Sequence, residues 1–208
     1  MRRPRIAAQV CSGRTRRAPI LFPLNFTGRT AVFEGEPGEL ERLCSRGPEA
    51  IAAPLDAAVA LANACARGSL KLPSLSFALV VLTDVDNAPL DEHYRDLFWR
   101  AFRVPVFEQL QEWDGTVVAR ECEVHDGLHL VSGADARVEH DRLWIGGRRT
   151  GLSASVIADH CDCGTETSRL KNLSAIRALH TAANNTPALG LAPQPSLQAG
   201  SEVSKRAA

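Results

Sequence analysis

The sequence has few aromatic residues and no excess of charge of either sign. Aromatic residues make up 5% of the 208 positions, and 24 basic side chains balance 24 acidic ones. A balanced charge provides no overall field that would attract nucleic acid or an anionic membrane surface. We therefore expect no nucleic-acid partner and no membrane partner.

Long apolar runs are also missing. No run approaches the roughly 20 residues that a helix needs to cross a bilayer. The N-terminal region has no apolar stretch followed by a small-residue cleavage site, so it does not have the pattern of a secretory signal. We expect a cytoplasmic protein, and in that reducing compartment its six cysteines favour a metal site over disulfides.

Composition divides the chain into three parts. Residues 1–33 contain several arginines and no acidic residue, and residues 1–22 are predicted to be a basic, disordered leader. Residues 23–173, with a higher apolar content, are predicted to form one compact domain. Residues 174–208 are mostly small and polar, have little to bury, and are predicted to be a disordered tail.

Apolar periodicity predicts alternating helices and strands in the first half of the domain. Helices are expected over 37–46, 54–68 and 90–101, and strands over 50–53, 77–82 and 104–107. The run Phe77–Leu82 is continuously apolar, which is typical of a strand covered on both faces of a parallel sheet. The alternation predicts an α/β fold with right-handed crossovers.

The second half of the domain has a different pattern. Short β segments are expected over 116–119, 128–131 and 143–145, and Gly146-Gly147 is a hairpin signal. The predicted fold class is therefore α/β, with a parallel sheet and flanking helices followed by a smaller, mostly-β region.

Four residues of the β region are typical metal ligands: Cys122 with His129, and Cys161 with Cys163. Thiolate and imidazole are the ligands that tetrahedral zinc prefers, and three thiolates with one imidazole leave no position for water. His125 is the alternative imidazole. Because the spacing is not that of a standard zinc finger, a redox pair and loop thiols without metal stay open as alternatives.

Acidic residues follow two of the predicted strands. Asp84 and Asp86 come directly after the run that ends at Leu82, where α/β proteins place ligand-contacting loops. Both are also typical turn and helix-cap residues. Glu112 and Asp114, with Glu108 before them, have the chemistry of a magnesium site or of a solvated acidic loop.

Three segments together resemble the phenylacetate-CoA ligase family of adenylate-forming enzymes: Phe102–Gln109, Ala119–His129 and Cys161–Gly164. The likeness covers roughly residues 39–170, which corresponds to part of the N-terminal domain of such enzymes. Its most specific part is the combination of Glu-Cys, Gly-Leu-His and Cys-x-Cys-Gly, which forms a structural metal site in zinc-containing members. By this resemblance the zinc ligands are Cys122, His129, Cys161 and Cys163.

The family activates a carboxylic acid with ATP and magnesium, forms an acyl-adenylate, and passes the acyl group to a thiol such as coenzyme A. By resemblance, Glu112 stands at the magnesium-binding position. Glu108 replaces the aromatic residue that stacks on adenine, and Leu152 replaces the acid that contacts the ribose. The candidate cofactor contacts on the loops after the buried strands are Asp84, Glu108 and Gln109.

Two further parts of the family pattern, the phosphate loop and the C-terminal lid with its catalytic lysine, have no counterpart in this sequence. We therefore expect a partial adenylate-forming domain that has no independent ligase activity and keeps a structural zinc site. The alternatives are an active or complemented ligase, which would also bind ATP and magnesium, and a redox or metal-handling protein that uses Cys161 and Cys163. The expected partner is a second copy of the chain or a complementing ligase subunit.

Overall fold

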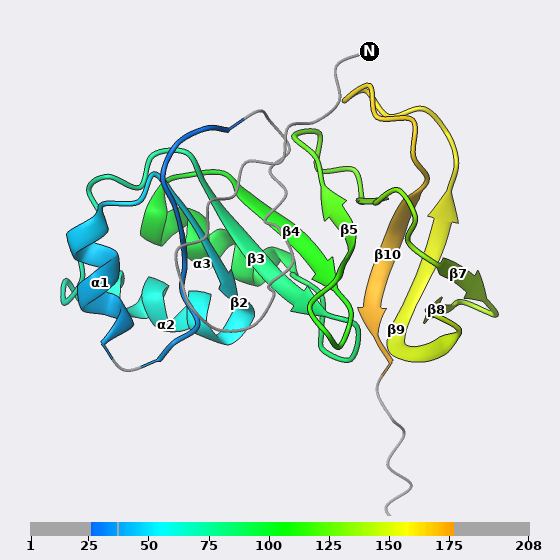
Figure 1. The fold of residues 1–208 in the computed structure, drawn as a ribbon, viewed down its shortest axis with the longest axis horizontal. Helices are drawn as coiled ribbons and strands as arrows, with labels where there is room; N and C mark the ends of the chain where they lie inside the picture. The colour runs from blue at the N-terminus through cyan, green and yellow to red at the C-terminus, as the bar shows by residue number, and fades with distance from the viewer. Residues whose placement is uncertain (1–25, 37, 177–208) are drawn as a thin grey trace, which may run out of the picture. The chain divides into compact units, whose positions relative to one another are not determined.

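The computed structural model describes residues 26–36 and 38–176, which form three helices and one ten-stranded sheet (Figure 1). The helices are α1 (Glu39–Arg46), α2 (Leu55–Ala66) and α3 (Glu92–Phe102). The strands are β1 (Thr30–Val32), β2 (Ala50–Pro54), β3 (Ala78–Asp84), β4 (Val106–Gln111), β5 (Val117–Glu121), β6 (Leu128–Leu130), β7 (Ala136–Glu139), β8 (Arg142–Ile145), β9 (Arg148–Ile157) and β10 (Arg169–Ala175). Their order across the sheet is β1-β2-β3-β4-β5-β6-β10-β9-β8-β7.

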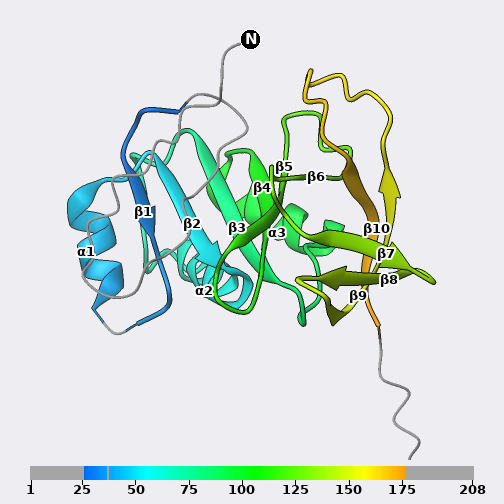
Figure 2. The same ribbon diagram turned by 45° about the vertical axis from the view of Figure 1, so that its right-hand side comes forward.

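Strands β1 to β4 pair in parallel, and a helix connects each to the next (Figures 1 and 2). This arrangement confirms the predicted α/β class. The observed elements agree with the predicted ones to within a few residues. Helix α3 begins at Glu92 because the side chain of Asp91 caps it, accepting a hydrogen bond from the Tyr94 N–H at 3.0 Å.

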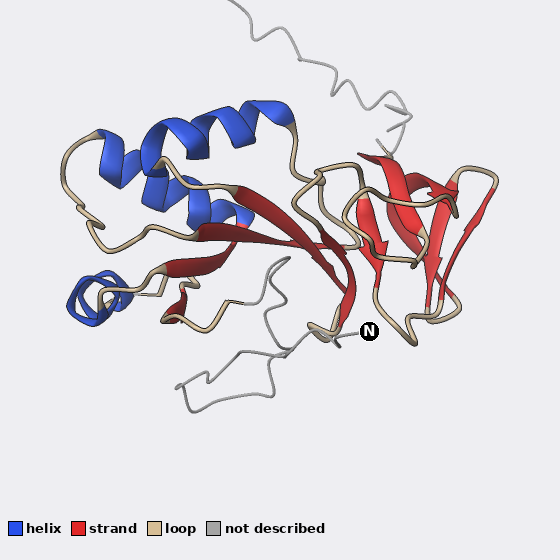
Figure 3. Cartoon of the chain, turned by 90° about the horizontal axis from the view of Figure 1, so that it is seen from above, coloured by secondary structure: helices blue, strands red, loops and turns tan. Residues whose placement is uncertain are grey.

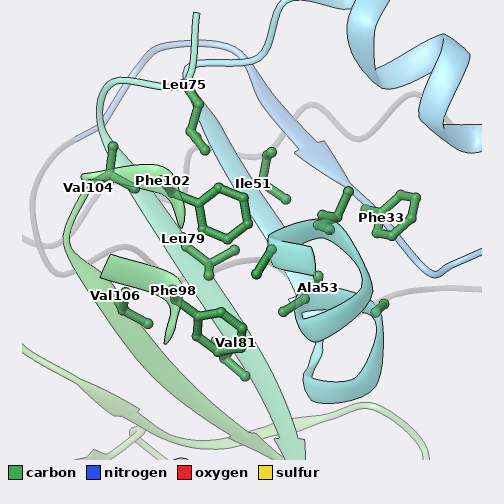
Figure 4. Close-up of a cluster of buried hydrophobic side chains, with 14 of the residues drawn as sticks. Phe33, Ile51, Ala53, Leu75, Leu79, Val81, Phe98, Phe102, Val104 and Val106 are labelled. Atoms are coloured by element: carbon green, nitrogen blue, oxygen red, sulfur yellow. The ribbon is translucent and has the colours of Figure 1, made fainter. Parts of the chain in front are cut away.

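The core of the parallel half lies between the sheet and its helices (Figure 4). Two helices run along one face of the sheet in Figure 3, and buried side chains of α2 and α3, such as Leu61 and Phe98, pack against alternate residues of β2 and β3. The intervening residues, Ala52 and Val80, form a separate buried cluster. Both sets of positions are buried, which explains the continuous apolar run through β3.

Strands β5 to β10 pair in antiparallel fashion and enclose a second core. Gly146 and Gly147 join β8 to β9 as the sequence predicts, with φ angles of 55° and 72° that favour glycine. Strands β1, β7, β9 and β10 have no counterpart among the strands predicted from the sequence. Arginines and serines interrupt the apolar residues of β9, and Lys171 and Asn172 interrupt those of β10, so the apolar alternation of each strand is too short to predict it.

The sheet extends from Thr30 in β1 to Ala175 in β10, compared with the predicted domain of residues 23–173. The predicted leader and residues 177–208 of the predicted tail lie outside the described residues. Within the described ranges, none of the helices is long and apolar enough to span a membrane.

Candidate metal centre

The four predicted metal ligands come together in the antiparallel half. The ligand atoms of Cys122, His129, Cys161 and Cys163 all lie within 4.8 Å of one another. The Sγ atoms of Cys122 and Cys161 are 3.8 Å apart, and Cys163 Sγ lies 3.3 Å from His129 Nε2. A tetrahedral zinc ion with Zn–S bonds of about 2.3 Å holds its sulfur ligands about 3.8 Å apart. The group therefore fits zinc in both ligand type and spacing.

Neighbouring strands position the first two ligands. Cys122 follows the last residue of β5, and His129 is the central residue of β6, which pairs with β5. Between them the chain reverses in a turn, in which the His125 N–H donates to the Cys122 carbonyl at 3.1 Å.

The other two ligands lie on the loop between β9 and β10. This loop turns at Gly164, whose N–H donates to the Cys161 carbonyl at 2.8 Å and whose φ angle is 77°. Strand β10 pairs with β9 on one side and β6 on the other, with Arg169 opposite His129. The sheet order therefore brings Cys161 and Cys163, which follow His129 by 32 and 34 residues, against the β5–β6 pair.

Hydrogen bonds around the ligands orient them for a cation. His129 Nδ1 lies 3.3 Å from both the carbonyl and the hydroxyl oxygen of Thr167. A proton on Nδ1, donated to the carbonyl, leaves the Nε2 lone pair directed toward the thiols, as in many metal sites. The Thr165 N–H donates to Cys163 Sγ at 3.4 Å, which favours the thiolate.

The thiols differ in acidity because their surroundings differ. Burial raises the pKa of Cys122 to about 12. Burial also acts to raise the pKa of Cys163, but hydrogen bonds from Thr165 and the neighbouring thiols outweigh it and lower that pKa. Burial lowers the pKa of His129, so its imidazole is held neutral and able to bind a metal.

A buried arginine that the sequence analysis missed joins the two ligand loops. Arg169 is 1% exposed, and its Nη1 donates to the Asp126 carbonyl at 3.0 Å and to the Asp126 carboxylate. Its Nη2 donates to the carboxylate of Asp159. Asp126 lies between Cys122 and His129, and Asp159 lies just before Cys161. In the sequence, the one available sign of a buried basic partner was that an aspartate lies close to each ligand pair.

His125, the alternative ligand, is not part of the group. Its Nδ1 lies 2.9 Å from Glu121 Oε1, and its ring stacks on Phe107 with centroids 5.0 Å apart. The structure thus selects His129 as the imidazole of the Cys3His group.

The two aspartates after β3 have turn roles. Asp84 Oδ1 accepts hydrogen bonds from the N–H groups of Asp86 and Asn87, both at 2.9 Å. Asp86 Oδ2 accepts a hydrogen bond from Trp113 Nε1 at 2.6 Å. The turn interpretation of these residues, one of the two that the sequence left open, agrees with these contacts.

The remaining predicted site residues are distributed along and after β4. Gln109 is fully buried within the strand, and Glu112 opens the next turn, its N–H donating to the Thr116 carbonyl at 2.8 Å. In residues 26–36 and 38–176, the Cys3His group is the one set of three or more cysteine, histidine or acidic side chains that converges as a metal site. The carboxylates of Asp84, Glu108 and Glu112 do not form another.

The position of Glu108 differs from that of a stacking aromatic residue. Its side chain is 4% exposed, and Oε1 accepts hydrogen bonds from the Thr83 hydroxyl at 2.8 Å and the Leu90 N–H at 3.1 Å. Burial raises the pKa of this carboxyl group to about 7. Leu152, at the position of the family's ribose acid, is fully buried in the second core.

Replacing Gly127 by alanine is expected to destabilise the β5–β6 loop, which leads into the strand that carries His129. Gly127 has a φ angle of 91°, and an added Cβ would lie 2.7 Å from the Leu170 carbonyl oxygen. The backbone strain and the clash together should cost about 3 kcal/mol in the free energy of unfolding. Chemical denaturation measures this change.

Gly133→Ala is the matched control, because Gly133 has a φ angle of 87° but nothing within 4 Å of an added Cβ. The free energy of unfolding of this variant should fall only by the cost of the left-handed backbone, about 1–2 kcal/mol. Equal losses in the two variants would show that the contact with Leu170 does not constrain the loop.

The parallel βαβ half joined to an antiparallel half defines an α/β fold that resembles part of an adenylate-forming ligase. Similar structures include the open conformation of 2-hydroxyisobutyryl-CoA ligase in complex with 2-HIB-AMP and CoA, with a TM-score of 0.54 and 14% sequence identity over 65% of this chain. The same enzyme in its thioesterification state has a TM-score of 0.54 and 15% identity over 68% of this chain.

A third structure of that ligase, in the postadenylation state with R3-HIB-AMP, has a TM-score of 0.52 and 14% identity over 65% of this chain. The matched part spans 35–38% of the ligase chains, so the likeness covers little more than a third of their length. No family profile and no curated protein matches the sequence.

Proposed function

We propose that the chain is an acyl-CoA-ligase-like domain, related to the phenylacetate-CoA ligase family, that holds a structural zinc ion. The observation that carries the proposal is the convergence of Cys122, His129, Cys161 and Cys163 within 4.8 Å. A zinc ion with four protein ligands has no open position for water, so its role is to stabilise the fold rather than to activate a reactant. The bound zinc would tie the β9–β10 loop to β5 and β6.

We further propose that the chain alone does not catalyse acyl-adenylate formation. Two positions at which the family contacts the nucleotide support this. Glu108 is engaged with Thr83 and Leu90 inside the protein, and Leu152 is enclosed in the second core. Neither side chain is placed to stack on adenine or to accept a hydrogen bond from a ribose, and each lost contact of this kind weakens transition-state binding.

Elemental analysis and calorimetric titration test both parts of this proposal on the same purified sample. We expect one zinc ion per chain and no heat on addition of ATP with magnesium. Measurable ATP affinity would instead support the alternative of an active or complemented ligase, and a screen of aryl acids with coenzyme A would follow. A chain without zinc would contradict the metal centre whatever the result with ATP.

A further inference from the structure

A cavity of about 770 Å³ lies beside the β5–β6 loop and includes none of the four metal ligands in its lining. It is open to solvent and is bordered by α3, the beginning of β4, the end of β5, the β5–β6 loop and β10. Its volume falls in the range of about 300–1,000 Å³ that is typical of small-molecule sites. The cavity is therefore large enough for a ligand, and the charge of its lining indicates which kind.

Acidic groups outnumber basic ones in the lining of the cavity. The acidic residues are Glu92, Asp96, Glu108, Glu121 and Asp126. The basic residues, Arg95 and Lys171, are already paired: Arg95 Nη2 lies 3.0 Å from Glu121 Oε1, and Lys171 Nζ lies 2.6 Å from Asp126 Oδ1. Concave sites focus the field of such unbalanced charge, so this lining attracts cations.

Two of the remaining acids lie on the solvent-exposed side of α3. Glu92 Oε1 is 4.0 Å from Arg95 Nε, and Asp96 Oδ2 is 3.7 Å from Arg100 Nη2, with both carboxylates largely exposed. Exposed ion pairs at these distances contribute little free energy. Both carboxylates can therefore exchange their arginine partner for a cationic ligand.

Glu108 provides a second, independent observation. It lines the cavity although its side chain is only 4% exposed. Both hydrogen bonds to this carboxyl group, from Thr83 and Leu90, go to Oε1. Among the described residues no hydrogen bond to Oε2 is found. Oε2 is not one of the fully buried side-chain atoms without a partner in this part of the chain, so it is not sealed inside the protein and can accept a hydrogen bond from a donor that enters the cavity.

Apolar groups form the rest of the wall. Leu90, Leu128 and Leu170 line the cavity together with Trp99, which is 49% exposed. An exposed indole ring attracts cations through its π face. Aliphatic side chains beside it suit the apolar part of a ligand.

We propose that this cavity binds a small organic cation, namely a primary ammonium or guanidinium group attached to an apolar body. The charged group interacts with Glu108 and the acidic rim of α3, and the apolar body lies against the leucines and Trp99. This inference requires neither a bound zinc ion nor a nucleotide, although Asp126 also contacts Arg169 beside the metal ligands and Glu108 corresponds, by resemblance, to the adenine-stacking position of the ligase family.

Calorimetric titration of the full chain with three probes of matched size tests the charge preference. The probes are 2-phenylethylamine, its neutral analogue 2-phenylethanol, and phenylacetate. The amine is expected to bind at least tenfold more tightly than either of the others. Equal affinity for amine and alcohol, tighter binding of phenylacetate, or no binding of the amine at millimolar concentration would overturn the proposal.

Glu108→Gln tests the buried carboxylate, since the amide keeps an acceptor for Thr83 and Leu90 but removes the charge. Amine affinity at pH 8 should fall about tenfold or more, in line with the loss of a charge-assisted hydrogen bond. Glu41→Gln, an exposed substitution on α1 outside the cavity, should leave amine affinity unchanged. The zinc content of both variants should equal that of the parent. A failure of the amine-binding proposal can therefore be distinguished from a failure of the zinc proposal.

A second variant covers the case in which Glu108→Gln does not fold. Glu92→Gln combined with Asp96→Asn changes only exposed side chains on α3, so the fold should persist. Amine affinity should fall severalfold while 2-phenylethanol binding stays the same. An unchanged amine affinity would show that the acidic rim plays no part and would contradict the proposed orientation of the ligand.

The affinity for the amine should increase with pH. With a pKa of about 7 in the free protein, Glu108 is mostly protonated at pH 6 and mostly ionised at pH 8. Because the amine stays protonated over this range, binding should tighten about tenfold from pH 6 to pH 8. Arg95 on α3, Glu121 on β5 and His125 on the β5–β6 loop also face this part of the cavity. If the pH dependence persists in Glu108→Gln, the assignment to Glu108 is wrong.

Discussion

Replacing Cys161 and Cys163 together by serine should abolish metal content and lower the melting temperature in the same variant. Structural zinc binding is coupled to folding, because the four ligands converge only in the folded chain. If zinc contributes about 5 kcal/mol to stability, its loss lowers the melting temperature of a domain of this size by about 10–20 °C. Elemental analysis and thermal unfolding measure the two quantities.

Cys44→Ser is the matched control, since Cys44 is an exposed free thiol on α1 and lies outside the metal group. It should keep both the zinc and the melting temperature of the parent. Treatment of the parent with a chelator should reproduce the effect of the double substitution. A double variant that melts like the parent would contradict the structural metal centre.

Cobalt substitution separates metal binding from the redox alternative. A Cys3His group that binds Co²⁺ in tetrahedral geometry gives strong visible absorption, which a Cys161–Cys163 disulfide cannot produce. We expect this absorption in the parent and its loss in the double variant. Oxidation of the two thiols without any cobalt spectrum would support the redox alternative instead.

Replacing Arg169 by lysine should weaken zinc binding about 10- to 100-fold, the usual effect of losing a group that orients metal ligands. The planar guanidinium of Arg169 reaches Asp126 through Nη1 and Asp159 through Nη2, so it holds both ligand loops at once. A lysine ammonium is a single point charge and cannot reproduce this two-sided contact. Competition with a chromogenic chelator measures the affinity.

Lys171→Met is the control for this substitution. Lys171 contacts Asp126 but makes no ion pair with the β9–β10 loop, and its side chain is partly exposed. Its removal should change zinc affinity much less than Arg169→Lys. If the two variants bind zinc equally well, the guanidinium does not position the ligands.

Local sequence patterns predicted the three helices and the strands β2, β3 and β4 of the parallel half, but not β1. Alternating apolar runs and helical periods are short-range signals, and a parallel βαβ arrangement follows from strands that alternate with helices. The antiparallel half was predicted only in outline. Its longest strand, β9, buries Thr150, Leu152 and Ala154 at alternate positions among arginines and serines, and this pattern is too weak to distinguish a strand from a loop.

For the candidate metal centre, residue chemistry and the family resemblance named the four residues that the structure brings together. The choice between His125 and His129 needed the structure. The two residues lie in the same short segment, and only the pairing of β6 with β10 shows that His129 faces the cysteines while His125 turns toward Glu121.

The sequence by itself therefore determined the α/β class, the ligand types and their grouping in two pairs, because these depend on local periodicity and on the chemistry of single side chains. Only the tertiary structure shows that Arg169 contacts both Asp126 and Asp159, and that an acidic cavity lies beside α3. Both depend on strand order, which places β10 between β6 and β9 and brings residues about 40 positions apart into contact. Such long-range pairing is set by the packing of the whole sheet and leaves no short-range signal in the sequence.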